Sequence, residues 1–468
     1  MGGAAALSVE PQSNLSQAID SAPLSPGHLR LFLLCLTLSV LDGFDTMVMS
    51  FLAPAISQDW GASHAAFGLV FSATLLGGAV GASFCGTLAD RFGRRWLVLG
   101  AVLWFALLTL ACAASVNLTA LIAMRFLAGL GLGGAIPNLL ALGGEYAPAR
   151  QRSTVVAVIT WGTPLGAVVG GLLTPAMLDA WGWRSVLYLA GAAPLALLPV
   201  AWFGLPESAR FLAARGASQA TLEKALGRVL GRGRVAALGV LRFTEATIAR
   251  PGPAALFRDG LAAGTILLAA TMFTSLILSF FLVNWSPTLL KLAGLQLKDA
   301  ILVTIALNLA GIVGSLVIAR IVDRRANGPA VLALTYLCAV AALGVAAWVT
   351  RAGHAQFAPV VLALAAAGFF LIGSQITMSA LITGFFPTQI RATGVGFNNA
   401  FARCGSLVGP AAGGLLLGYG LSPAQLLLAG MIPGGLSALF LLVFATLVSR
   451  RERRSPAALD ARQAPGIL

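Results

Sequence analysis

Twelve long apolar segments, separated by short loops that carry most of the charges, run the length of this 468-residue chain. Each is long enough to cross about 30 Å of bilayer hydrocarbon as an α-helix. Only 10% of the residues are charged, against about 25% in an ordinary soluble domain. The sequence therefore predicts an all-α membrane protein with transmembrane helices near 31–56, 66–89, 96–115, 118–144, 153–178, 184–204, 262–288, 299–321, 329–350, 357–384, 391–417 and 423–448.

Lys and Arg cluster in alternate loops, and both chain ends belong to the basic set. Cytoplasmic loops of membrane proteins carry an excess of Lys and Arg, so both termini are expected in the cytoplasm. This distribution also explains the net charge of +14, and no nucleic-acid partner is predicted. The opposite set of loops holds only Arg184, Lys291, Lys298 and Arg351.

An Arg- and Gly-rich stretch near the middle of the chain separates the apolar segments into two sets of six. It contains a helical patch at 221–230 and is expected to lie along the membrane surface as a linker. At about 55 residues it is too short to be expected to form an enzyme domain. The predicted organisation is a cytoplasmic tail (1–30), a six-helix bundle (31–204), the linker (205–261), a second six-helix bundle (262–448) and a cytoplasmic tail (449–468).

The two sets of six segments repeat each other's motifs. Asp90-Arg91 after the second segment recurs as Asp323-Arg324 after the eighth, and the loop 148–152 recurs as 387–391. Repeated six-helix units are typical of transporters that bind substrate near the midplane between two pseudo-symmetric halves. Beyond those loops, Gly166 and Gly170 correspond at the same offset to Gly405 and Gly409.

The loop 86–95 reads Gly-Thr-Leu-Ala-Asp-Arg-Phe-Gly-Arg-Arg and strongly resembles the signature loop of the major facilitator superfamily. A carboxylate among several guanidinium groups can break and remake ion pairs as two halves rock. We therefore expect a cytoplasmic gate here, beyond the loop's role in setting orientation. The gate candidates are Asp90, Arg91 and Arg94, with Glu145 and Arg152 around the following loop, and Asp323 and Arg391 in the second half.

Two carboxylates, Asp42 and Asp45, lie three residues apart inside the first apolar segment, so they share one helix face. A charge at mid-membrane costs about 3 kcal/mol on insertion scales, and these groups should therefore face a polar cavity or a partner. Two carboxylates this close also disfavour double ionisation. We interpret them as candidate proton carriers, with a purely structural ion pair as the alternative.

Several segments together resemble the aromatic acid:proton symporter family. They are 42–46 (Asp-Gly-Phe-Asp-Thr), 125–138 with its Gly-rich run, 145–148 and 205–211 (Leu-Pro-Glu-Ser-Ala-Arg-Phe). The resemblance covers both halves. It implies proton-coupled import of compounds such as benzoate, hydroxybenzoates, protocatechuate or gentisate across a bacterial inner membrane. It further implies roles in transport for Asp42, Asp45, Arg125, Glu145, Arg391 and Arg403.

Arg125 and Arg403 are cations inside apolar segments and must face protein or water. A guanidinium can hold a carboxylate through two parallel hydrogen bonds. Arg403 has no acidic neighbour inside a segment of its own half, so it is our first candidate for binding the substrate carboxylate. It could instead pair with Asp42 or Asp45 across the cavity. Arg125 is equally compatible with substrate binding and with an ion pair to these aspartates.

A flat aromatic acid needs rings to stack on and groups that hydrogen-bond its substituents. The further candidates are Asn399, one turn before Arg403, together with Trp285 and Gln375. No cofactor or metal site is predicted, because the cysteines and histidines do not cluster. The Gly-Leu-Gly run at 129–134 formally fits a dinucleotide motif but is interpreted as a close-packing helix seam.

The leading hypothesis is an importer of an aromatic carboxylate that moves with protons, acting as a monomer in contact with membrane lipid. A symporter of a non-aromatic acid and a proton-driven exporter would use the same fold and the same acidic pair. A membrane sensor that binds ligand without flux is a third class. An intramembrane enzyme is disfavoured, since no nucleophile–base cluster appears.

Overall fold

The computed structural model describes residues 12–236, 240–242, 252–258, 260–325, 327–351, 355–387 and 389–453. Within these residues, twelve helical spans are long and apolar enough to cross a membrane, as the sequence predicts. Parts of the predicted tails and of the linker, including 1–11, 243–251 and 454–468, lie outside the described residues.

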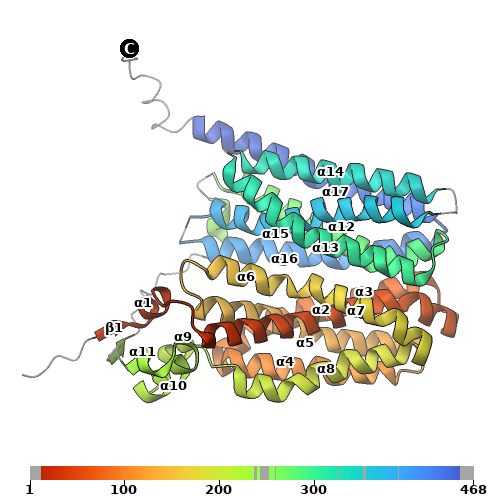
Figure 1. Cartoon of the computed structure of the whole chain (residues 1–468). Coiled ribbons are helices and arrows are strands. Elements are labelled where there is room, and N and C mark those ends of the chain that lie inside the picture. The colour runs from red at the N-terminus through yellow and green to blue at the C-terminus, as the bar shows by residue number, and fades with distance from the viewer. Residues whose placement is uncertain are drawn as a thin grey trace, which may run out of the picture.

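The first six spans form one half of the molecule (Figure 1). The fifth span is built from two helices, α6 and α7, that meet at Trp161. The helices of this half are α2 (Pro26–Trp60), α3 (His64–Phe92), α4 (Arg94–Ala113), α5 (Leu118–Tyr146), α6 (Arg152–Thr160), α7 (Gly162–Trp181) and α8 (Trp183–Gly204).

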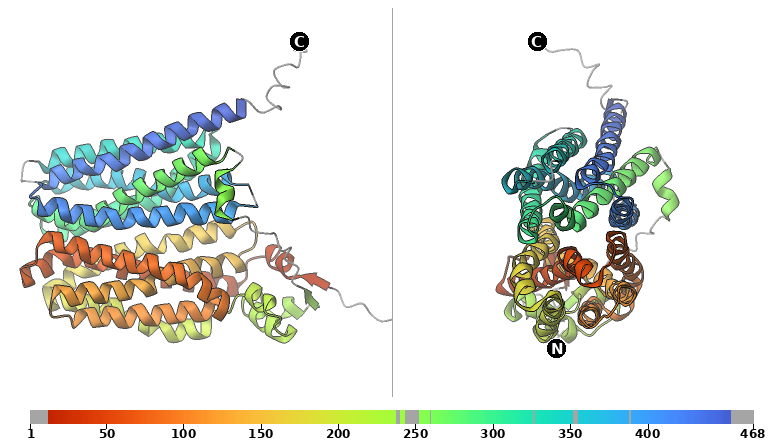
Figure 2. Two further views of the ribbon diagram at one scale, coloured as in Figure 1. Left: turned by 180° about the vertical axis from the view of Figure 1, so that it is seen from behind. Right: turned by 90° about the vertical axis from the view of Figure 1, so that its right-hand side faces the viewer.

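The last six spans form the second half, which lies beside the first when the molecule is viewed along its helices (Figure 2, right). Its helices are α12 (Ala262–Leu292), α13 (Leu297–Arg324), α14 (Gly328–Thr350), α15 (Phe357–Phe385), α16 (Arg391–Gly418) and α17 (Pro423–Arg453).

Short elements from the N-terminal segment and the linker gather at one end of the spans, which we call the linker end (Figure 1). The opposite end is called the far end. The sequence patch at 221–230 is part of α10, whose apolar side packs on the first half. The two three-residue strands, which pair in parallel, were not expected from the sequence. The elements are β1 (Gln12–Asn14), α1 (Leu15–Asp20), α9 (Ala209–Ala214), α10 (Gln219–Leu230), α11 (Arg232–Ala236), β2 (Val240–Arg242) and a 3-10 turn, η1 (Pro253–Phe257).

Helix ends follow local sequence signals. At the start of α2, the Ser25 side chain accepts a hydrogen bond from the His28 N–H, and Pro26 occupies the first turn, where its missing N–H costs nothing. Between α3 and α4, Gly93 adopts a φ of 95°, a conformation that favours glycine. This single residue lets the chain reverse from one transmembrane helix into the next.

Equivalent glycines bring equivalent helices together in the two halves. A Cβ atom added at Gly166 of α7 would lie 2.2 Å from the Val40 carbonyl oxygen of α2. A Cβ atom added at Gly405 of α16 would lie 2.1 Å from the Phe273 carbonyl oxygen of α12. The backbones therefore approach as closely as only glycine permits, and the motif repeat seen in the sequence is a repeat of helix packing.

The Gly-rich run of α5 forms the close helix seam that the sequence predicts. A Cβ at Gly129 would lie 2.2 Å from the Thr74 carbonyl oxygen, and one at Gly133 would lie 2.0 Å from that of Gly78. Both partners belong to α3. No dinucleotide-binding strand precedes this run in the described residues, since α5 follows α4 directly.

The two halves join in the far-end part of their helices. Ser50 of α2 donates a hydrogen bond to Asn284 of α12 at 2.9 Å. Closer to the far end, α3 and α16 approach each other: a Cβ atom added at Gly68 would lie 3.0 Å from the Cα atom of Gly414. Toward the linker end, a Cβ at Gly86 or Gly396 would meet nothing within 4 Å. We infer that the halves are packed together at the far end.

Candidate functional site

The paired aspartates lie midway along α2, where that helix packs against α7. Gly43, between them, approaches α7 so closely that a Cβ there would lie 2.4 Å from the Thr163 carbonyl oxygen. Both Asp42 and Asp45 are buried. The close contact fixes the rotation of α2 and so determines where each carboxylate points.

Asp45 lies in a closed hydrogen-bonded network. Its Oδ2 atom is 3.3 Å from Nη1 of Arg125, and both side chains are fully buried. Thr109 of α4 donates to Asp45 Oδ1 at 2.5 Å and accepts from Arg125 Nη2 at 2.9 Å. Arg125 Nε also lies 3.2 Å from the Cys112 sulfur. The ion pair thus has hydrogen-bonding partners around it, the condition under which a buried pair is tolerated.

Asp42 has a different environment although it lies less than one turn away. Its Oδ2 atom is buried and has no hydrogen-bond partner among the described residues. Arg403 of α16, in the other half, is close enough to interact with it electrostatically. The two groups nevertheless form no ion pair within 4.0 Å in the part of the chain that the structure describes. Asp42 is therefore the carboxylate of the pair that has no fixed partner.

Arg403 is partly buried, and its side chain makes one weak hydrogen bond among the described residues. Nη1 lies 3.4 Å from the Gly78 carbonyl oxygen of α3, at the long limit for a hydrogen bond. Asn399, one turn earlier on α16, is exposed. A guanidinium with unused donors beside an exposed amide can receive a carboxylate and one further polar group of a ligand.

The structure places the other two predicted contacts differently. Trp285 is fully buried where the two halves join at the far end. Its indole N–H donates to the Pro410 carbonyl at 3.0 Å, and its ring packs edge-on against Phe71 of the first half. Gln375 of α15 is partly exposed. As substrate contacts, Trp285 and Gln375 stay predictions.

The residues of the predicted gate lie at the linker end, and two of them, Arg94 and Glu145, are joined within the first half. Arg94, at the start of α4, forms an ion pair with Glu145 at the end of α5. Ser208 donates a hydrogen bond to the same carboxylate at 2.5 Å. Glu145 thus pairs with Arg94 rather than with Arg152, which follows it in the sequence.

Glu207, at the start of the linker, holds the first turn of α4. Its Oε1 atom accepts hydrogen bonds from the backbone N–H groups of Arg94 at 2.9 Å and Arg95 at 3.2 Å. A carboxylate satisfies the free N–H groups at a helix N-terminus and interacts favourably with the helix dipole. The Tyr146 hydroxyl donates to the Glu207 carbonyl at 2.6 Å, so α4, α5 and the linker meet here.

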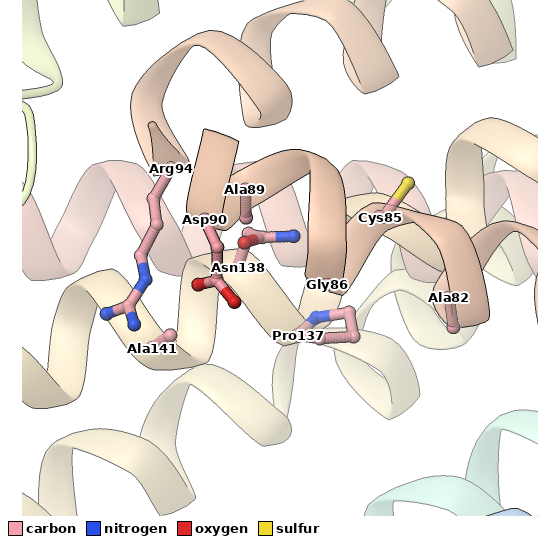
Figure 3. Close-up of a pocket in the computed structure, with 9 residues that line it drawn as sticks. All are labelled: Ala82, Cys85, Gly86, Ala89, Asp90, Arg94, Pro137, Asn138 and Ala141. Carbon is pink, nitrogen blue, oxygen red and sulfur yellow. The ribbon is translucent and has the colours of Figure 1, made fainter. Parts of the chain in front are cut away.

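Asp90 and Arg94 line a small pocket between α3 and α5, and the Asn138 amide lies beside the Asp90 carboxylate (Figure 3). Asp90 is exposed and belongs to no ion pair among the described residues. Arg91 is also exposed, and its carbonyl accepts a hydrogen bond from Arg215 of the linker at 2.5 Å.

The remaining gate candidates are Arg152, Arg391 and Asp323. Arg152 forms an ion pair with Asp20 of α1 and donates to the Gly144 carbonyl at 3.0 Å. Arg391 donates to the Phe386 carbonyl at 3.3 Å. Asp323 is exposed at the end of α13. As gate residues, all seven candidates stay predictions.

Sequence reasoning missed the groups that complete these networks. Thr109 and Cys112 are uncharged and lie in an apolar stretch, so nothing in the sequence marks them as partners of Arg125. Glu207 belongs to a motif that carried the family resemblance, but its contact with α4 depends on tertiary structure. Asn398, which precedes Asn399 on α16, is buried, and its Oδ1 atom has no hydrogen-bond partner among the described residues.

The arrangement can bind an anion and hold a proton. Among the described residues, Arg403 has one long hydrogen bond and interacts electrostatically with Asp42, whose Oδ2 atom has no hydrogen-bond partner. The neighbouring ion pair of Asp45 and Arg125 is already satisfied. Among the described residues, no group of three His, Cys, Asp or Glu side chains could hold a metal ion.

Comparisons with known proteins bear on the family and on the fold. The model of the Major Facilitator Superfamily matches residues 34–372. The chain is 39% identical to a gallate transporter of Pseudomonas putida, over 93% of this chain and 95% of the relative. It is 37% identical to the 4-hydroxybenzoate transporter PcaK of Pseudomonas aeruginosa, over 90% and 93%. The xylose transporter XylE from E. coli, solved inward open, shares the fold with a TM-score of 0.65 at 19% identity, over 89% of this chain and 96% of that one.

Proposed function

Because the chain belongs to the major facilitator superfamily, among its aromatic acid transporters, we propose that it imports a small aromatic carboxylate together with protons. The halves would alternate between opening at the far end and opening at the linker end. The observation that carries the proposal is the contrast between Asp42, without a fixed partner, and Asp45, held by Arg125.

Asp42 and Arg403 are proposed to couple the two fluxes. When Asp42 is ionised, it attracts the Arg403 guanidinium across the cavity. A proton taken from the far side neutralises Asp42 and leaves Arg403 free to form two parallel hydrogen bonds with the substrate carboxylate. Release of both at the linker side returns Asp42 to its ionised form. Substrate binding and proton binding thereby favour each other.

Asp45 and Arg125 are proposed to keep their charges throughout this cycle. Both are fully buried and hydrogen-bonded to each other and to Thr109. Protonating Asp45 would leave the Arg125 guanidinium buried beside a neutral partner, which costs several kcal/mol. The pair therefore anchors α2 to α4 and α5, and Asp42 is the member of the motif that titrates.

The linker end is proposed to face the cytoplasm of a bacterial cell, with the protein in the inner membrane. Basic residues concentrate at this end, as the positive-inside rule requires. The ion pair between Arg94 and Glu145 then lies on the cytoplasmic side. With the packed far end facing outward, this arrangement is proposed to be the state that releases substrate into the cell.

The ring of the substrate is proposed to lie near Asn399 and Gln375, whose amides can pair with ring hydroxyl groups. Support for this placement comes from two similar proteins, which are named as transporters of gallate and of 4-hydroxybenzoate. Both compounds carry ring hydroxyl groups. A single copy of the chain contains all the residues of the proposed site, so we propose that the monomer is the transporting unit.

Uptake by purified protein in proteoliposomes tests the proposal. The panel contains labelled gallate, 4-hydroxybenzoate, benzoate and an aliphatic acid of similar size, each measured with and without an inward proton gradient. We expect saturable uptake of an aromatic acid that the gradient accelerates. Preference for the aliphatic acid would refute the aromatic assignment, and acceleration by an outward gradient would refute import. Saturable binding without flux would indicate a sensor.

Arg403→Gln serves as the site variant and Arg351→Gln as its charge-matched control, since Arg351 is exposed at the far end. A substrate carboxylate bound by Arg403 predicts loss of uptake in the first variant only. Equal uptake by both variants would show that Arg403 does not bind the carboxylate.

A further inference from the structure

A second cavity, unrelated to the central charges, opens at the linker end of the first half. It has a volume of about 720 Å³ and lies between the first turns of α2, the last turns of α8 and the linker helices α10 and α11. Gly27 of α2 approaches α10 so closely that a Cβ there would lie 2.4 Å from the Val229 carbonyl oxygen. The linker is therefore packed firmly against the bundle at the edge of this cavity.

One wall of the cavity is strongly basic. Lys224 and Arg228 lie one turn apart on α10, and Arg232 follows at the start of α11. Arg30 of α2 joins them. None of these four cations forms an ion pair with a carboxylate in the part of the chain that the structure describes. The cavity's one carboxylate, Glu223, accepts a hydrogen bond from Gln219 at 3.0 Å.

The other wall is apolar and exposed. Leu33 of α2 has 64% of its surface exposed, and Val200 and Phe203 of α8 have 57% and 78%. These residues belong to spans that cross the membrane, so their exposed faces meet hydrocarbon. In a membrane, we expect the apolar wall to continue from the cavity into the acyl-chain region and the basic wall to lie at the level of the headgroups.

We propose that this cavity binds an anionic phospholipid, with its phosphate between Lys224, Arg228 and Arg232 and its acyl chains along Leu33 and Phe203. Basic residues beside a transmembrane helix attract anionic lipids. A soluble phosphate ester could satisfy the cations but would leave the apolar wall unused. The inference requires only that α2 and α8 span a membrane, and it does not depend on which substrate is carried.

Bound lipid would also link three parts of the molecule. The cavity is formed by the linker helices, by α8 and by α2, the helix that carries Asp42 and Asp45. A phosphate that neutralises the mutual repulsion of the linker cations should hold α10 against the bundle. Arg228 adds to that repulsion, since it also interacts unfavourably with Arg95 at the start of α4.

Native mass spectrometry of the full chain in detergent tests the inference, with phosphatidylglycerol and phosphatidylcholine titrated separately. Each Lys or Arg near an anionic lipid contributes about fivefold in affinity. We expect K224Q/R228Q/R232Q to lose at least about tenfold in phosphatidylglycerol affinity. The control R258Q/R320Q/R325Q removes three exposed cations outside the cavity at the same end and should change the affinity less than about twofold.

The conservative variant K224R/R228K/R232K should retain binding, which separates loss of charge from misfolding. Wild-type protein alone gives a second test, because phosphatidylglycerol should bind more tightly than phosphatidylcholine and weaken as salt rises. Equal affinity for both lipids, or equal loss in the two triple glutamine variants, would overturn the inference. Displacement of phosphatidylglycerol by glycerol 1-phosphate at similar concentration would show that the site takes soluble phosphate esters instead.

Discussion

Replacing Asp42 and Asp45 of α2 separately by asparagine should distinguish a structural carboxylate from one that carries the proton. Asp45→Asn leaves the Arg125 guanidinium fully buried without its counter-ion. Breaking a buried pair in this way costs about 3–5 kcal/mol. Thr109 and Cys112 still contact Arg125, so we expect a loss near the lower value, about 3 kcal/mol.

Asp42→Asn is the matched control, because it makes the same change on the same helix. Its Oδ2 atom has no hydrogen bond to lose, and an amide needs no counter-ion. We therefore expect its free energy of unfolding to fall by less than about 1 kcal/mol. The double variant Asp45→Asn/Arg125→Gln removes both charges, so it should recover part of the free energy of unfolding that Asp45→Asn loses. The coupling energy between the two residues should be about 2 kcal/mol or more.

Denaturant titration of the purified variants in one detergent, followed by intrinsic tryptophan fluorescence, measures these differences. The expected order of stability is wild type close to Asp42→Asn, then the double variant, then Asp45→Asn. Equal destabilisation by the two asparagine substitutions, or strict additivity in the double variant, would refute the assignment of Asp45 and Arg125 as a fixed ion pair.

Three further predictions concern other parts of the molecule. Arg403→Lys should bind substrate at least about tenfold more weakly, because an ammonium group cannot form two parallel hydrogen bonds with a carboxylate; unchanged affinity in equilibrium binding would contradict this. Glu207→Ala should lower stability by about 1–2 kcal/mol through loss of the α4 cap, and an unchanged denaturation midpoint would argue against the cap. Gly414→Val should slow transport at least about tenfold while retaining substrate binding, because its Cβ would lie 2.9 Å from the Cα atom of Gly68 and hold α3 and α16 apart at the far end. A wild-type transport rate would show that transport does not require this contact between the halves.

The fold was largely predictable because a bilayer leaves few alternatives. A span must be helical and apolar to satisfy its backbone in hydrocarbon, so segment length and the Lys and Arg distribution specify twelve helices. The repeated glycines of the sequence, Gly166 and Gly405, also lie at close contacts between helices in the structure. The two-stranded pairing of β1 with β2 was not predicted, because three-residue strands leave no periodic signal.

The candidate site was predictable in its charges but not in its pairing. Charges inside apolar segments are costly, which singles out Asp42, Asp45, Arg125 and Arg403 from the sequence. Which aspartate pairs with Arg125 depends on how Gly43 sets the rotation of α2, and this is a property of the packed bundle. The contact between Glu207 and α4 likewise joins segments more than a hundred residues apart.

The central claim is that Asp42 carries the proton that moves with the substrate. Proteoliposomes loaded with a pH-sensitive dye report internal acidification when 4-hydroxybenzoate is added outside, relative to protein-free vesicles. The account predicts that wild-type protein acidifies the interior, whereas Asp42→Asn exchanges labelled substrate across the membrane without acidification. Acidification by Asp42→Asn at the wild-type rate would contradict the account.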